Sequence, residues 1–110
     1  MCFNKIKVKD TEKIIEELKK KIVEQYPDLI GIYLYGSRAK GNFHKESDLD
    51  ILLLFPAVTS EKKFEIYGIV SYIEYKFDVF IDIKILTPSE FRKNPFYFEQ
   101  VTNSGIYFGE

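Results

Sequence analysis

Two apolar runs on either side of a polar segment limit what this chain can fold into more than any other feature. Leu29–Tyr35 and Leu49–Phe55 are rich in aliphatic and aromatic residues and have the length of single strands. The segment between them contains Gly36 and Gly41 and ends in Ser47-Asp48-Leu49-Asp50. The pattern predicts a strand–turn–strand unit whose polar side chains gather where the two strands meet the turn.

Asp48 and Asp50 stand at the start of the second run. Side chains alternate between the faces of a strand, so the two carboxylates point the same way while Leu49 points to the other face. Neighbouring anions repel each other, and a fold that brings them together usually supplies a cation. Carboxylate oxygens suit Mg²⁺, which shares its coordination shell with substrate phosphates. Asp is also common in turns, so an exposed turn is the alternative interpretation.

Gly36 and Ser37 follow the first run and precede residues 38–40, which can form a helical turn. Backbone N–H groups and the Ser37 hydroxyl can therefore converge on an anion at a helix start. The spacing is not that of a Walker A loop. Gly36 and Gly41 can also be ordinary turn glycines. An anion cradle and a carboxylate pair in one unit nevertheless favour a site for a metal-bound phosphate.

These motifs resemble those of a known superfamily. Gly36-Ser37-Arg38-Ala39-Lys40-Gly41 followed by Ser47-Asp48-Leu49-Asp50 is similar to the G-S-x-x-x-G…S-D-x-D signature of the DNA polymerase β-like nucleotidyltransferases. The minimal, MNT-type members of that superfamily have about this length. The resemblance implies an α/β (α+β) fold, in which a small mixed β-sheet is flanked by helices, over a single nucleotidyltransferase domain, residues 1–110.

The same resemblance implies an activity and a set of site residues. The activity is Mg²⁺-dependent transfer of a nucleoside monophosphate, AMP from ATP, to a hydroxyl acceptor with the help of two metal ions. Asp48 and Asp50 are the implied catalytic metal ligands. The implied nucleotide-binding residues are Gly36, Ser37, Arg38 and Ser47.

A third carboxylate is expected in the strand-like run Val79–Leu86. Asp82 shares a strand face with Lys84, and an ion pair between these two side chains is one interpretation. The other, which the resemblance implies, is that Asp82 completes a catalytic and metal-binding triad with Asp48 and Asp50. Asp78, at the entrance of the strand, is the alternative third acid, and some small members of the superfamily lack this acid.

The rest of the pattern predicts helices around these strands. Apolar residues at helical spacing predict helices from residue 10 or 11 to about 26 and from 59 or 60 to about 75. Thr87-Pro88-Ser89-Glu90 is a capping box that begins a short helix. A further helix over about 96–103 precedes a short edge strand at 106–108, and its Phe96, Phe98 and Val101 are expected to pack on the sheet. Phe64, Tyr67 and Tyr72 widen the apolar face of the second helix. This breadth predicts a helix that is buried on more than one side or that offers a surface to another subunit, so a homo-oligomer is compatible with the pattern, and simple packing on the sheet is the alternative.

Composition excludes some classes of function. The chain has 17 acidic and 16 basic residues and a net charge of −1, whereas proteins that hold nucleic acid mainly by electrostatics are usually clearly basic. Strong nucleic-acid binding is therefore not expected. Cys2 is the only cysteine, which fits a reducing compartment. No apolar run approaches the length of a membrane span and no signal-peptide core is present, so a cytoplasmic protein is expected.

Several functions remain open. The first is an enzyme that modifies a protein, and the resemblance suggests the HEPN partner of an MNT–HEPN toxin–antitoxin pair. The alternative is a non-catalytic nucleotide- or partner-binding module that retains the fold. An antibiotic-modifying transferase and a polymerase are disfavoured, because no further region would hold their substrates. Arg38 or Lys40 can add positive charge, and His44 is expected in solvent, since metal-assisted transfer needs no histidine.

Overall fold

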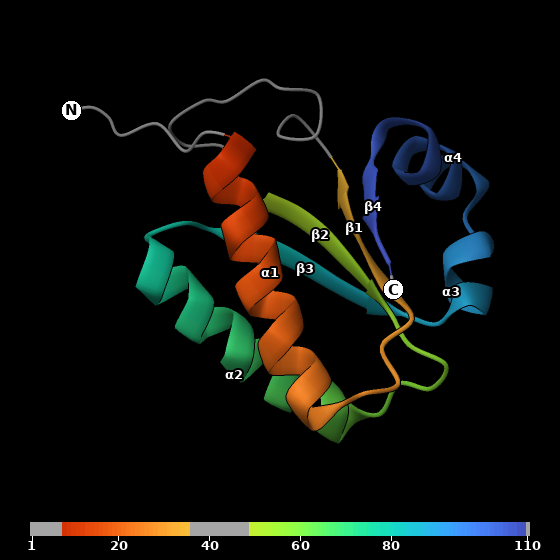
Figure 1. Cartoon of the computed structure of the whole chain (residues 1–110). Helices are drawn as coiled ribbons and strands as arrows, with labels where there is room; N and C mark the ends of the chain where they lie inside the picture. Colours follow the sequence, from red (N-terminus) through yellow and green to blue (C-terminus); the bar gives the residue numbers. More distant parts are fainter. Residues whose placement is uncertain (1–7, 36–48, 110) are drawn as a thin grey trace.

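The computed structural model describes residues 8–35 and 49–109 of the 110-residue chain. Figure 1 shows its four helices and four strands in these ranges. In chain order they are α1 (Val8–Gln25), β1 (Gly31–Tyr35), β2 (Leu49–Leu54), α2 (Ser60–Phe77), β3 (Ile81–Leu86), α3 (Pro88–Arg92), α4 (Pro95–Ser104) and β4 (Ile106–Phe108). None of the helices in these ranges has both the length and the apolar character that a membrane span requires.

The four strands form one mixed sheet in the order β3-β2-β1-β4. β1 pairs antiparallel with both β2 and β4, whereas β2 and β3 run parallel. Parallel neighbours need a crossover connection, and α2 supplies it between β2 and β3. The predicted α/β fold with a small mixed sheet flanked by helices is confirmed, including the edge strand at 106–108.

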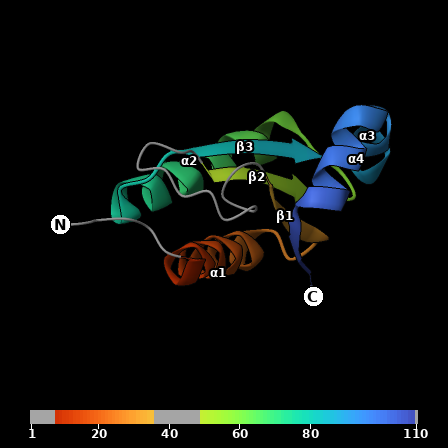
Figure 2. The ribbon, with the colours of Figure 1, turned by 90° about the horizontal axis from the view of Figure 1, so that it is seen from above.

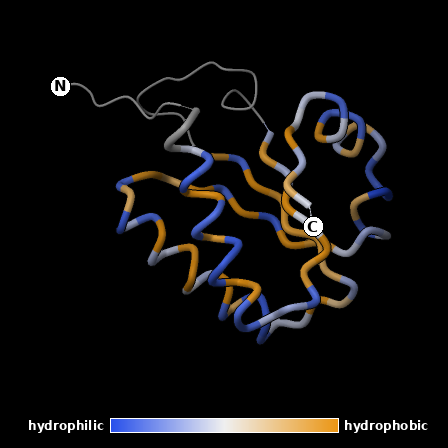
Figure 3. Tube along the Cα trace, viewed as in Figure 1, coloured by the Kyte–Doolittle hydropathy of each residue, from blue (hydrophilic) through white to orange (hydrophobic). Residues whose placement is uncertain are grey.

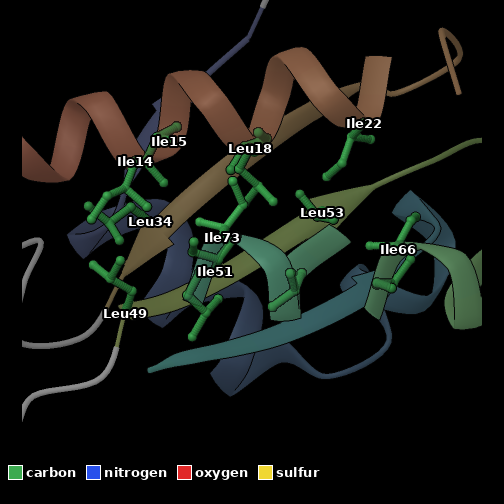
Figure 4. Packing of buried hydrophobic residues seen from close by; sticks show 14 of the residues in the cluster. Ile14, Ile15, Leu18, Ile22, Leu34, Leu49, Ile51, Leu53, Ile66 and Ile73 are labelled. Atoms are coloured by element: carbon green, nitrogen blue, oxygen red, sulfur yellow. The ribbon is translucent and has the colours of Figure 1, made fainter. Parts of the chain in front are cut away.

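One face of the sheet packs against α1 and α2. Figure 4 shows Leu34, Leu49, Ile51 and Leu53 of the strands beneath side chains of the two helices. The helix residues buried there include Ile14, Ile15, Leu18, Ile22, Ile66 and Ile73. Their helical spacing forms the apolar stripes that hold both helices on the sheet. Figure 3 shows hydrophobic residues gathered along the strands, whereas hydrophobic and hydrophilic residues alternate along the helices.

The other face of the sheet packs against α3 and α4, which Figure 2 shows at one end of the strands, away from α1. The buried cluster there consists of Tyr35, Leu52, Leu54, Phe91 and Val101. Three residues in and just before β3 are exposed and not buried like this cluster. Phe80 is 73% exposed, and Asp82 and Lys84 are exposed as well. Among the described residues, this face is therefore covered over β1 and open over the start of β3.

Side-chain caps determine where the later helices begin. The Thr59 side chain caps α2, and Thr87 forms a reciprocal capping box with Glu90 at α3. Asn94 caps α4 by accepting a hydrogen bond of 3.2 Å from the Tyr97 backbone N–H. The helix starts predicted at 59 or 60 and at the capping box are therefore confirmed.

The limits of α1 and α2 differ from those expected. α1 already includes Val8, so Thr11 lies buried inside the helix instead of capping it. α2 continues to Phe77, beyond the expected end near residue 75. It ends there because Asp78 adopts the left-handed conformation, with φ of 54°, and its N–H bonds back to the Glu74 carbonyl.

Several aromatic residues expected to be buried are exposed instead. Phe96 is 86% exposed, because α4 turns Val101 and not Phe96 toward the sheet. On α2, Phe64 is 78% exposed and Tyr67 and Tyr72 are about half exposed. α2 packs on the sheet by its opposite side, so the prediction that it is buried on more than one side is wrong. Its role as a surface for another subunit stays a prediction.

Lys62 joins the start of α2 to the turn that precedes β1. Its side chain is almost fully buried, and its Nζ donates hydrogen bonds to Asp28 Oδ2 at 2.9 Å and to the Ala57 carbonyl at 2.7 Å. The ammonium group also lies 4.4 Å from the centroid of the Phe55 ring. A buried charge with several partners is costly to remove, because the partners lose their donor.

We expect Lys62→Met to lower the free energy of unfolding by about 1.5–3 kcal/mol, the usual contribution of hydrogen bonds to a charged group. Met keeps most of the aliphatic stem, so the loss reports on the ammonium group. Urea denaturation followed by circular dichroism measures it. Lys63→Met, at the exposed neighbouring position, is the control and should unfold like the wild type. Equal stability of the two variants would contradict this account.

Candidate active site

Tyr35, Asp50 and Asp82 form a row across three neighbouring strands. The register pairs Tyr35 of β1 with Asp50 of β2, and Asp50 with Asp82 of β3. Residues directly opposite each other on adjacent strands point to the same face. This is the face of the buried cluster to which Tyr35 belongs. Asp50 is half-buried and Asp82 is exposed, so the carboxylates lie where the covered part of the face gives way to the open part.

The register distinguishes Asp82 from the alternatives. Asp82 and Lys84 both lie in the described strand β3, and the structure shows no ion pair between them. Asp78 closes α2 and precedes β3, so it has no place opposite Asp50. The residue that faces Asp50 across the parallel pair is Asp82. Its role as third catalytic carboxylate stays a prediction.

The other predicted site residues lie outside the described residues. They are Gly36, Ser37, Arg38, Ser47 and Asp48, together with Lys40 and His44. The described chain leaves the sheet at Tyr35 and re-enters it at Leu49. Both points are at the end of the sheet that carries the row of Tyr35, Asp50 and Asp82. The roles of the undescribed residues stay predictions.

Tyr97 joins this row from α4. Its hydroxyl donates a hydrogen bond of 3.0 Å to the Tyr35 hydroxyl, and the two rings meet edge to face with centroids 5.6 Å apart. Burial is the main reason that the pKa of each tyrosine is raised, and the nearby carboxylates of Asp50 and Asp82 raise it further. Both hydroxyls therefore stay protonated at neutral pH. No role for Tyr97 could be predicted from the sequence, because the helix pattern does not reveal Tyr35 as its partner.

A hollow of about 440 Å³ lies in the helix layer, between α1 and α2. Its lining consists of Lys21, Glu24, Gln25, Glu65, Gly68, Ile69 and Tyr72. The helices pack on the face opposite to that of Asp50 and Asp82, so the sheet separates this hollow from the carboxylate row. The carboxylate row, and not the hollow, carries the predicted chemistry.

Comparison with known protein families gives a match that spans most of the chain. The model of the nucleotidyltransferase domain family matches residues 15–108. This chain belongs to the nucleotidyltransferase domain family. A Methanocaldococcus jannaschii protein, whose name assigns it to the protein adenylyltransferases, is 32% identical to this nucleotidyltransferase over 97 residues, which are 84% of this chain and 93% of that protein. The resemblance read from the G-S and S-D-x-D motifs is thus confirmed.

Solved structures share the fold of this nucleotidyltransferase. A chain of a toxin–antitoxin complex with AMP-PNP matches it with a TM-score of 0.66 and 24% identity, over 90% of this chain and 73% of that chain. A chain from the complex of a tri-AMPylated Shewanella oneidensis HEPN toxin with its MNT antitoxin matches with a TM-score of 0.57 and 24% identity, over 90% of this chain and 69% of that chain. At these identities the likeness establishes the shared fold.

In this nucleotidyltransferase, Asp50 and Asp82 fit a divalent cation such as Mg²⁺. They are oxygen donors at directly opposed positions, and the exposure of Asp82 leaves the pair within reach of an ion. Within residues 8–35 and 49–109, no three His, Cys, Asp or Glu side chains gather closely enough to hold a metal. Mg²⁺ usually takes one or two carboxylates and completes its shell with water and substrate phosphates, so a carboxylate pair suffices for the fit.

Proposed function

We propose that this nucleotidyltransferase transfers AMP from ATP to a hydroxyl group of a partner protein of the HEPN type. The observation that carries the proposal is the direct opposition of Asp50 and Asp82 on the partly open face of the sheet. Two relatives support the choice of nucleotide and acceptor. One is named a protein adenylyltransferase, and the other is found in a complex that contains a tri-AMPylated HEPN toxin.

The transfer forms one bond and breaks another. The acceptor oxygen bonds to the α-phosphorus of ATP while the bond from that phosphorus to pyrophosphate breaks, and the hydroxyl proton is lost. Asp48, Asp50 and Asp82 would hold Mg²⁺, which supplies activation of the hydroxyl and neutralisation of the leaving pyrophosphate. Gly36, Ser37, Arg38 and Ser47 would bind the phosphates of the nucleotide. Asp82 lies beside the open part of the face, and this exposure supports a role for it on the acceptor side.

The shape of the face favours a large acceptor. Small-molecule acceptors are usually enclosed in concave pockets, whereas Phe80, Asp82 and Lys84 lie on an exposed part of the sheet. The hollow between α1 and α2 is separated from the carboxylates by the sheet. A hydroxyl at the surface of a folded partner can approach Asp82 from the open side, and a protein acceptor is therefore the better fit to the described residues.

Label transfer tests this function and the role of Asp82. The purified protein is incubated with Mg²⁺, ATP labelled at the α-phosphate and a HEPN-type protein from the same genome. We expect label on the partner, and Asp82→Asn should lower the initial rate about 10²–10³-fold, the usual cost of losing one preorganised electrostatic contact. Asp78→Asn is the matched control, since Asn tolerates the left-handed conformation of that position.

Two outcomes would contradict the proposal. Asp82→Asn as active as Asp78→Asn would remove Asp82 from the site. Partner binding that needs neither Mg²⁺ nor the carboxylates, with no label transferred, would support the non-catalytic binding module instead.

A further inference from the structure

The two tyrosine hydroxyls beside the carboxylates differ in where their protons go. A hydroxyl has one proton to donate and can accept at its lone pairs. Tyr97 uses its proton on the Tyr35 oxygen, which leaves the Tyr35 proton available to another acceptor. The acceptor groups in the Tyr35 row are the carboxylates of Asp50 and Asp82, and Asp50 is its direct cross-strand neighbour.

Both tyrosines are held firmly by their surroundings. Tyr35 is 7% exposed and ends β1, in the buried cluster with Phe91 and Val101. Tyr97 lies in the first turn of α4, where its backbone N–H is bound by the Asn94 cap. Its ring also meets the Phe91 ring edge to face, with centroids 5.7 Å apart. The orientation of the hydroxyl pair is therefore set by α4 and not by a bound ligand.

We propose that the Tyr97–Tyr35 hydroxyl pair positions the Asp50 carboxylate for metal binding. Tyr97 donates to Tyr35, and in the metal-bound site Tyr35 would donate to Asp50, with which it forms no hydrogen bond in the described part of this structure. Carboxylates that bind metals are commonly held by such hydrogen bonds, and loss of one typically costs 10–100-fold in metal affinity or activity. Both tyrosines act through Asp50, so they are positioning residues. The inference rests on the proposed function, because it presumes that Asp50 is a metal ligand.

Phenylalanine variants separate positioning from packing. Tyr35→Phe keeps the ring but leaves the Tyr97 proton without its acceptor, so its melting temperature should fall. The double variant Tyr35→Phe with Tyr97→Phe removes both partners at once and should recover most of that loss. Tyr33→Phe is the matched control. It lies on the same strand and face as Tyr35, but its cross-strand neighbour is Leu52 instead of a carboxylate.

The measurement is Mn²⁺ binding in the presence of a non-hydrolysable ATP analogue, followed by the electron paramagnetic resonance of free Mn²⁺. We expect the double variant to bind Mn²⁺ about 10–100-fold more weakly than the wild type, although it folds as well. Tyr33→Phe should bind like the wild type. In the transfer assay the double variant should lose turnover by a similar factor at saturating ATP, with the KM for the acceptor protein unchanged.

The outcomes distinguish this inference from the proposed function. Asp50→Asn is measured alongside and should abolish the tight Mn²⁺ binding. Weakened binding in Asp50→Asn together with wild-type binding in the double phenylalanine variant would overturn the positioning role alone. Wild-type binding in Asp50→Asn would overturn the proposed function, and the positioning role with it. Absence of label transfer by a wild type that binds Mn²⁺ through Asp50 would leave the positioning role standing and reject the proposed acceptor.

Discussion

Replacing Asp50 with Asn is expected to reduce AMP transfer at least about 10³-fold without unfolding the protein. Asn has almost the shape of Asp but lacks the negative charge that a hard divalent cation needs in its ligand. Asp50 is the central member of the row, between Tyr35 and Asp82, so no neighbouring carboxylate of β2 or β3 in the described residues can replace it. Initial rates of label transfer at saturating Mg²⁺ and ATP measure the loss.

The stability of the fold should respond far less to this substitution. Asn keeps the size of the Asp side chain and can still accept a hydrogen bond at its amide oxygen, so the free energy of unfolding should change by less than about 1 kcal/mol. Asp28→Asn is the matched control, because Asp28 forms its ion pair with Lys62 at the other end of β1. It should keep full transfer activity. A large loss of stability in Asp50→Asn would show that Asp50 supports the fold and not the reaction.

Ile51→Ala is expected to lower the free energy of unfolding by about 2–5 kcal/mol, a large part of the roughly 5–15 kcal/mol that stabilises a domain of this kind. Ile51 is fully buried on the central strand β2, in the cluster under α1 and α2, where Figure 4 shows it beside Leu49 and Ile73. A smaller side chain leaves a cavity that the surrounding helices cannot close completely. Urea denaturation with a common m-value measures the change.

Ile106→Ala is the matched control for this loss. Ile51 and Ile106 are both isoleucines in strands, and both are register partners of Leu34 on β1. They differ in burial, because Ile51 is fully buried whereas Ile106, on the edge strand β4, is 42% exposed. Its truncation should cost less than about 1 kcal/mol, because less apolar surface returns to water. Similar losses in the two variants would mean that α1 and α2 contribute little to the core.

Features that depend on neighbouring residues could be predicted from the sequence. The alternation in β1 places Tyr33 and Tyr35 on the face opposite to Ile32 and Leu34, as the two buried clusters confirm. The capping box at Thr87 depends on residues within one turn. Phe64 could not be placed, because an apolar pattern shows that a helix has a broad apolar surface but not which side will find a partner.

Lys62 and Tyr97 were missed for a related reason. The partners that give them a role, Asp28 and Tyr35, lie far away in the sequence. A lysine on an amphipathic helix is normally read as solvated, and a tyrosine in a C-terminal helix as part of the core. Only the packing of α2 against the turn before β1, and of α4 against β1, turns these two residues into specific hydrogen-bond donors.

The sequence by itself determined the strand–turn–strand unit, the family and the face of β2 on which Asp50 lies, because side-chain alternation and motif spacing are local properties. The tertiary structure decided that Asp82 faces Asp50 and that Tyr35 completes the row. Alternation specifies which residues share a face, but the register between strands depends on how the intervening segments pack. A slip of one residue between β2 and β3 would turn Asp82 toward the helices, so the helix α2 and the core beneath it set the carboxylate pair.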